Sequence, residues 1–424
     1  ALAAHYASCG NMVCALENYQ QAALKAEAVF AWQEAELHYT QALEIAAHLP
    51  ASLLNDKIAF RWAEMLAGRA HLHFLQGHLS ERDADLAAME TLSADSQNTR
   101  LFLVALTHRV RYLTLDGHYS QAIALASKGV TLSEQTKDDR SRARLLSHQG
   151  FAHYFLGQPR PALETLQAAL SAMSSTSDIE MRGRIVHILG YIYFHLGEYS
   201  RSLAYQQEAL VCHRQTGDAN RQAWDLLEIS RLYLEMGQIP QGQSILVKNL
   251  ARVRELGLQP VELHCLATLG FSELYQRNAQ AANTYFSQAL ALQAKIQSRH
   301  TQALVENGLA IALWQGGQLA EARQILTRAT ENTRSIAHRR LLVDALLELG
   351  LVEITSGQFA KAIEYLQEAF SLATESEYNA GTALCLAAWA RAERLAGAPA
   401  PALAHAQQAL NTAMEKGLAT CAMW

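Results

Sequence analysis

Proline, charged residues and long apolar runs are all scarce in this chain. Only 7 of its 424 residues are proline and 18% are charged, whereas about a quarter of the residues in an average soluble domain are charged. No apolar run reaches the roughly 18 residues that a membrane-spanning helix needs. We therefore expect no membrane segment and no disordered chain, because half of the residues are hydrophobic and supply a large core.

Basic clusters and targeting signals are also missing. The formal net charge is −5 and no block of Lys and Arg stands out, which excludes general nucleic-acid binding through phosphate contacts. The first residues lack the charged and apolar regions of a secretory signal peptide. The six cysteines do not follow a common zinc-binding spacing. We predict a cytoplasmic protein with free, buried thiols.

The motifs of common catalytic sites are absent as well. The sequence contains no GxxxxGK[ST], GxSxG, HExxH or GxGxxG segment. Its tightest histidine pair is His71 and His73, and residues two apart on a helix point in nearly opposite directions. We therefore expect no enzyme, no cofactor and no metal site, so that function has to come from a surface.

A 40-residue repeat runs through most of the chain. Glycine recurs at this interval, and only position 277 departs from it, with Arg277-Asn278 in place of the glycine. Alanine or another small residue follows five and twelve positions later, as at Ala322 and Ala329. The glycines of the repeat are Gly77, Gly117, Gly157, Gly197, Gly237, Gly317, Gly357 and Gly397.

This pattern predicts a helix A, a tight turn and a helix B in each repeat. Glycine supplies the positive φ that ends a helix, and small residues let two helices pack closely. No stretch alternates strictly, as a half-buried strand would. We expect an all-α protein with helices A centred near residues 106, 146, 186, 226, 266, 306, 346 and 386. Asn tolerates left-handed φ, so the turn at 277–278 should keep its shape, with residue 277 or 278 near the left-handed region.

The repeat resembles the tetratricopeptide repeat. The small-residue, glycine, aromatic, leucine and alanine ladder of that family is met by Gly190, Gly197, Tyr199, Leu203 and Ala209. The length is 40 residues instead of 34, as in the long-repeat subclass of signalling scaffolds and bacterial regulators. The resemblance covers roughly residues 60 to 417. It implies a right-handed superhelical solenoid of stacked helix-turn-helix units.

The two ends of the chain differ from the repeats. Residues 1–48 are helical but off the 40-residue grid. Their stretch from Asn18 to Leu43 resembles the segment that joins the nucleotide-binding module to the repeats in STAND-type signalling ATPases. We expect about nine repeats in residues 49–417 and the start of another in 418–424. Because a solenoid normally ends on a polar capping helix, we expect a piece of a longer polypeptide.

Helix A lines the concave face of such a solenoid. Residues at the same position of successive helices A form columns, and the columns that face away from helix B predict a groove. Arg and aromatic residues, the types that dominate binding hot spots, gather there. Arg144 and Arg184, one repeat apart, should form a ladder about 10 Å in spacing that suits carboxylates or phosphates. The candidate residues are Arg111, Arg144, Phe151, Tyr154, Arg184, His187, Tyr191, Phe194, Trp224 and Arg231.

Two alternatives stay open for these columns. The aromatic residues can instead pack against neighbouring repeats, with the arginines forming a solvated face. The later repeats are more apolar, with Leu304, Ile311, Trp314 and Leu351, which suits either an apolar ligand or tight packing.

Three functional hypotheses follow. In the first, the chain is the sensor or interaction arm of a STAND-type ATPase or transcriptional regulator. Its groove would bind a protein, a peptide or a small acidic effector, but neither nucleic acid nor a membrane. In the second, it is a stand-alone adaptor that binds an extended peptide. The third, an enzyme or enzyme subunit, requires perturbed titratable groups that converge in one pocket.

Overall fold

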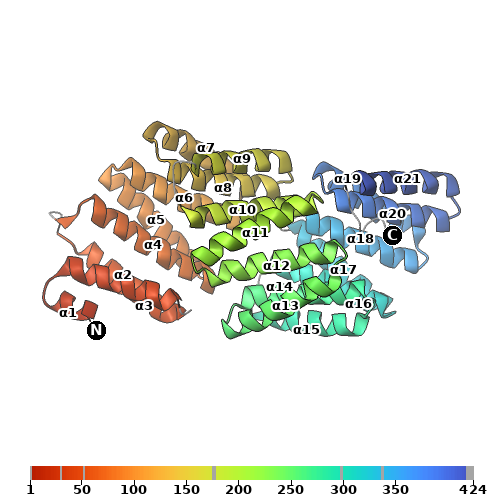
Figure 1. The fold of residues 1–424 in the computed structure, drawn as a ribbon, viewed down its shortest axis with the longest axis horizontal. Coiled ribbons are helices and arrows are strands. Elements are labelled where there is room, and N and C mark those ends of the chain that lie inside the picture. Colours follow the sequence, from red (N-terminus) through yellow and green to blue (C-terminus); the bar gives the residue numbers. More distant parts are fainter. Residues whose placement is uncertain are drawn as a thin grey trace. The chain divides into compact units, whose positions relative to one another are not determined.

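A computed structural model describes residues 2–28, 31–50, 53–173, 178–296, 299–335 and 339–416. Within these ranges the regular secondary structure is helical and no strand occurs, which confirms the predicted all-α repeat solenoid. The chain divides into two compact units. The first comprises Ala1–Gln149 with Ala172–Thr176, and the second comprises Gly150–Ser171 with Ser177–Trp424. Successive helices of each unit lie side by side in pairs (Figure 1).

The first unit holds the helices before the boundary. They are α1 (Leu2–Ser8), α2 (Met12–Ala28), α3 (Trp32–Ala47), α4 (Asp56–Gln76), α5 (Leu79–Ser96), α6 (Thr99–Leu115) and α7 (Tyr119–Thr136). The boundary itself falls within α8 (Asp139–Phe155).

The second unit holds the remaining helices. They are α9 (Pro159–Ala172), α10 (Ile179–His195), α11 (Tyr199–Gln215), α12 (Ala219–Glu235), α13 (Ile239–Glu255), α14 (Gln259–Tyr275), α15 (Ala279–Ile296), α16 (Arg299–Gln315), α17 (Leu319–Ser335), α18 (Arg339–Thr355), α19 (Phe359–Glu375), α20 (Asn379–Leu395) and α21 (Pro399–Lys416). Every even-numbered helix from α6 to α20 is centred one residue after the predicted position. These are the helices A.

Small residues let the two helices of a repeat approach closely. Ala322 and Ala329, five and twelve residues after the turn glycine, have no exposed surface, as predicted for their columns. Gly270 on α14 and Gly308 on α16 both face Phe286 on α15. The ring of Phe286 occupies the space that a side chain at either glycine would need. A Cβ atom added at Gly308 would come within 2.2 Å of this ring. The glycines therefore make room for the core aromatic residue.

The exceptional turn at Arg277 keeps the geometry of the glycine turns. Arg277 has φ 60°, and its N–H donates to the Leu274 carbonyl at 3.0 Å, while the Asn278 N–H donates to the Glu273 carbonyl at 2.9 Å. In the next repeat the Gly317 N–H donates to the Trp314 carbonyl at 3.0 Å and the Gln318 N–H to the Leu313 carbonyl at 2.8 Å, which is the same pattern. The prediction of a left-handed residue at this turn is therefore confirmed.

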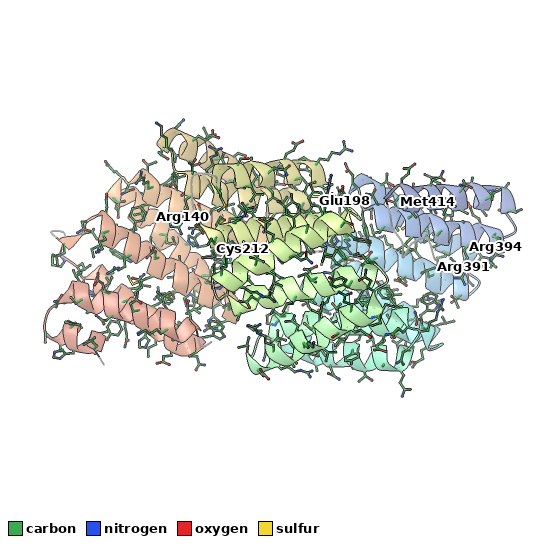
Figure 2. The ribbon with its side chains drawn as sticks, in the orientation of Figure 1. Arg140, Glu198, Cys212, Arg391, Arg394 and Met414 are labelled. Carbon is green, nitrogen blue, oxygen red and sulfur yellow. The ribbon has the colours of Figure 1, made fainter. Side chains whose placement is uncertain are left out.

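The cysteines follow their prediction only in part. The five that lie in the described part of the chain are free thiols. Cys212 (Figure 2), Cys265 and Cys385 are buried, but Cys9, in the turn after α1, is exposed and Cys14, in the first turn of α2, is half-buried. None of the described helices is both long and apolar enough to cross a membrane.

The C-terminal helix α21 has an apolar side that is open to solvent. Leu403 and Met414 (Figure 2) are 72% and 70% exposed. Residues 418–424, predicted to begin another repeat, lie outside the described residues.

The Arg277 turn yields a prediction about stability. Replacing Arg277 with Gly should stabilise the protein by about 0.5–1 kcal/mol, because a residue with a Cβ atom costs about 1–2 kcal/mol in the left-handed region, partly offset by the entropy of glycine in the unfolded chain. Gly317→Ala, at φ 85° and without crowding neighbours, should destabilise by a similar amount. Urea unfolding of both variants measures these changes. Effects of the same sign would contradict the argument.

Candidate functional site

Within the second unit, the end of α10 meets the beginnings of α18 and α20. The Asn379 side-chain amide donates to the Leu196 carbonyl at 3.1 Å, although 183 residues separate them. Arg340 contacts the His195 ring, and Phe194 shares an apolar cluster with Ala383. Each repeat rotates slightly against the previous one, so the repeats from α10 to α20 form one closed turn.

This turn surrounds a cavity of about 280 Å³. Side chains of all six helices A from α10 to α20 line it, with those of α11 and the residues before α20. Its apolar walls come from Phe271, Leu304, Ile311 and Leu384, among others. The charged or ionisable lining residues are His195, Arg231, Glu235, His264, Tyr275, Arg340, Asp344, Glu348 and Tyr378. The cavity therefore combines an apolar surface with an unusual density of charge.

The two arginines of the cavity already have partners. Arg231 donates to the Glu228 carboxylate at 3.1 Å and lies 4.8 Å above the Phe194 ring. Arg340 contacts His195, and its Nε lies 3.9 Å from Asp344 Oδ2. The guanidinium groups are therefore largely neutralised by neighbouring residues of this chain.

Two of the three cavity carboxyls are also bonded. The Tyr378 hydroxyl donates to Asp344 at 3.1 Å, and the Tyr275 hydroxyl donates to Glu235 at 2.9 Å. Burial raises the pKa of Asp344, although Arg340 and this hydroxyl oppose the shift. Both carboxyls are thus held in place by tyrosine.

Glu348 and Asn307, unlike Asp344 and Glu235, each have a buried side-chain oxygen without a partner in the described part of the chain. Neither Glu348 Oε2 nor Asn307 Oδ1, both buried atoms, has a hydrogen-bond partner among the described residues. Burial, reinforced by the charge of Asp344, raises the pKa of Glu348 to about 8. Asn307 is only 4% exposed. Buried polar atoms are nearly always paired, so two unpaired acceptors in one cavity wall point to a ligand or to water.

Four of the ten residues predicted for the groove lie together beside this cavity. Phe194 and Arg231 line it. Tyr154 and Tyr191 have ring centroids 5.5 Å apart, and both rings contact His195. The aromatic residues thus pack mainly on each other and on the closure of the turn, as the packing alternative anticipated.

The other predicted residues of the second unit lie elsewhere. Trp224 packs on the His264 ring at 5.0 Å. His187 bonds the buried Asp225 at 2.8 Å, and His213 bonds the same carboxylate at 2.6 Å. Phe151 packs on Phe155 at 4.6 Å, and Arg184 on α10 is half-buried.

Arg111 and Arg144 belong to the first unit. Arg111 lies 3.4 Å from His71 Nδ1. Arg144 lines a separate hollow of about 760 Å³ with three further basic residues, Arg100, Lys137 and Arg140, and three acidic ones, Glu64, Asp138 and Asp139. Arg184 belongs to the second unit, so the ladder of Arg144 and Arg184 stays a prediction.

Three residues of the cavity wall are not among those predicted from the sequence. They are Arg340, Glu348 and Tyr378. A signal did exist for Glu348, because Glu228 occupies the same column three repeats earlier. Acidic residues in a column of helix A were not weighed against the arginines.

Comparison with known proteins supports the repeat assignment. A tetratricopeptide-repeat family profile matches residues 341–415, and a second such profile matches residues 183–210. These ranges cover α18–α21 and α10–α11. Among curated proteins, none matches the sequence significantly. The fold is that of an all-α repeat solenoid. The chain contains a tetratricopeptide-repeat domain.

Solved structures with the same fold include a Rap protein complexed with competence and sporulation factor, which is 13% identical with a TM-score of 0.66 over 84% of this chain and 98% of that one. A Rap conjugation regulator of plasmid pLS20 in complex with the Phr* peptide is 12% identical, with a TM-score of 0.52 over 98% and 97%. A STAND protein with a tetratricopeptide repeat sensor from Pyrococcus horikoshii is 14% identical, with a TM-score of 0.52 over 87% of this chain but only 56% of that one.

The raised pKa of Glu348 yields a prediction about pH. As the pH rises from about 4.5 to 8, this carboxyl ionises in the unfolded chain but stays protonated in the folded protein. The wild-type protein therefore loses stability over this window, by at most about 1.4 kcal/mol per pH unit. Glu348→Gln lacks this titration, so its stability relative to wild type should increase from pH 5 to pH 8.

Denaturation at several pH values measures this difference. Glu364→Gln, at an exposed position of α19, is the matched control and should show no such trend. A constant difference between Glu348→Gln and wild type would show that Glu348 titrates normally.

Proposed function

We propose that the chain is a scaffold that binds a peptide or a segment of another protein, and that the ligand enters the cavity of the second unit. The observation that carries this proposal is the closed turn of six helices A around one cavity with unpaired buried acceptors. Concave sites with apolar walls and a few convergent polar groups are typical of ligand binding. The Rap regulator complexed with the Phr* peptide has a similar fold, which supports a peptide as the ligand.

Binding suits the cavity better than catalysis. The enzyme hypothesis required perturbed titratable groups in one pocket, and Asp344 and Glu348 are such a pair. Tyr378 and Arg340 hold Asp344 in place, however, so that one member of the pair is already engaged by residues of this chain. The described residues contain no cluster of His, Cys, Asp and Glu that would hold a metal ion.

An acidic effector, predicted from the arginines, finds less support. Carboxylates of this chain lie beside both arginines of the cavity. The hollow around Arg144 has four basic but also three acidic side chains. We therefore place the principal ligand in the cavity and not on an arginine ladder.

We further propose that this scaffold is the sensor arm of a larger STAND-type signalling ATPase, with residues 1–48 as the connecting segment. The similarity to the STAND protein with a repeat sensor supports this, as does the sequence from Asn18 to Leu43. Sequencing of the gene should reveal a P-loop motif within about 300 codons upstream of Ala1, the reach of a nucleotide-binding module of one or two domains. An open reading frame without one favours the stand-alone adaptor.

The ligand site can be tested with random heptapeptides displayed on phage. Leu304→Trp should fill the cavity from α16 and abolish binding of the peptides that wild-type protein selects. Val247→Trp, on the exposed side of α13, is the control and should bind them unchanged. Circular dichroism checks that both variants stay folded. Peptides that bind Leu304→Trp as well as wild type would place the site elsewhere.

A further inference from the structure

We propose that the cavity selects ligands that carry one protonated amine on a small apolar body, with Glu348 as the counter-charge and Asn307 as a neutral acceptor. This inference rests on the proposed function, because it names the ligand chemistry of the same cavity. The amine can belong to a free small molecule or to a peptide, as a lysine side chain or an amino terminus.

The first argument is the balance of charge. The arginines, Arg231 and Arg340, contribute two positive charges to the cavity. Four carboxyls lie in it or directly behind it, namely Glu228, Glu235, Asp344 and Glu348. With Glu348 protonated and the other three ionised, the acidic groups exceed the basic ones by one. A cationic ligand therefore improves the balance, and an anionic ligand worsens it.

The second argument is the kind of polar atom that lacks a partner. Glu348 Oε2 and Asn307 Oδ1 are both acceptors, on neighbouring helices α18 and α16. The donor Arg340 Nε also has no hydrogen-bond partner among the described residues, but Asp344 Oδ2 lies 3.9 Å from it and balances its charge. An ammonium group has three donors and no acceptor, so it matches acceptor oxygens in the wall without leaving a lone pair of its own buried. A carboxylate has only acceptors and satisfies neither. A hydroxyl has one donor and satisfies only one.

The third argument is size and surface. Leu304 and Ile311 on α16, Phe271 on α14 and Leu384 on α20 form the walls. The volume of about 280 Å³ is at the small end of ligand pockets, which span roughly 300–1,000 Å³. It therefore suits one aromatic or aliphatic group and not a long stretch of folded chain.

The protonation of Glu348 gives the proposal a specific signature. With a pKa of about 8, this carboxyl is mostly protonated at pH 7, whereas an alkyl ammonium pairs best with a carboxylate. Binding of the ammonium therefore transfers the Glu348 proton to the solvent and forms the ion pair. About one proton is released for each amine bound.

Other ionisable groups also face Glu348 across the cavity. Those on its own helix and next to α20 are Asp344, Arg340 and Tyr378. Those on α10, α12 and α14 are His195, Arg231, Glu235, His264 and Tyr275. Because they are present in wild type and variant alike, a Glu348→Gln comparison isolates the proton that comes from Glu348.

The test is isothermal titration calorimetry at pH 7 with 2-phenylethylamine, 2-phenylethanol and 3-phenylpropanoate, in two buffers of different ionisation enthalpy. The amine should bind at least about tenfold more tightly than the alcohol, as expected for a charge-assisted hydrogen bond, and the carboxylate should bind most weakly. Glu348→Gln should reduce the preference to about twofold or less and abolish proton release. Glu364→Gln should keep both.

A second pair of probes identifies the source of the amine. A short peptide with a free amino terminus is compared with its acetylated form. The ratio of affinities of the free over the acetylated peptide is compared with the ratio of affinities of 2-phenylethylamine over 2-phenylethanol. A larger ratio for the peptide assigns the site to a peptide, and a larger ratio for the amine assigns it to a small molecule. Either result supports the proposal.

Two results would overturn it. The first is equal or tighter binding of the alcohol or the carboxylate, and the second is an amine preference that survives Glu348→Gln. Failure here is distinct from failure of the proposed function. Heptapeptides that need an open cavity but show no preference for an amine would refute only the ligand chemistry. Amine binding in the cavity without any peptide binding would refute only the peptide scaffold.

Discussion

The close approach of neighbouring helices at small residues is the constraint on which the rest of the structure depends. Where Gly270 and Gly308 face Phe286, no side-chain atom separates the helix backbones from the aromatic ring. Packing this close leaves little freedom in the angle between successive hairpins, because protein interiors are as dense as crystals. A small rotation therefore repeats at every step from α10 to α20, and these steps together close the turn around the cavity.

The periodic features of this fold could be predicted because they are local. The glycine interval located every helix A from α6 to α20 to within one residue, and it predicted a left-handed residue at 277 or 278, where Arg277 has φ 60°. The closure could not be predicted. The hydrogen bond from Asn379 to Leu196 joins residues 183 positions apart, and it depends on rotations that accumulate over five repeats and that no single repeat displays in its sequence.

Some residues of the candidate site could be predicted from the sequence, but the pairing of their charges could be predicted only in part. Phe194 and Arg231, two of the predicted residues, line the cavity, but Arg231 bonds Glu228 on the same helix. The position of an arginine in a groove column does not show whether a carboxylate of the same protein already pairs with it. Three residues separate Glu228 from Arg231, so this pairing was visible in the sequence. The contact of Arg340 with His195, 145 residues away, was not.

The closure also gives the cavity a means of acting on the rest of the chain. Arg231 and Asn307 come from the middle of the turn, whereas Glu348 and Tyr378 come from the part that meets α10. Only the closed turn presents all of them to one ligand. A ligand that binds the closed form preferentially shifts the population towards it by its difference in affinity for the two forms. A ligand in the cavity would therefore contact residues on both sides of the closure between α10 and α20, and would stabilise that closure by the contacts it makes with both sides.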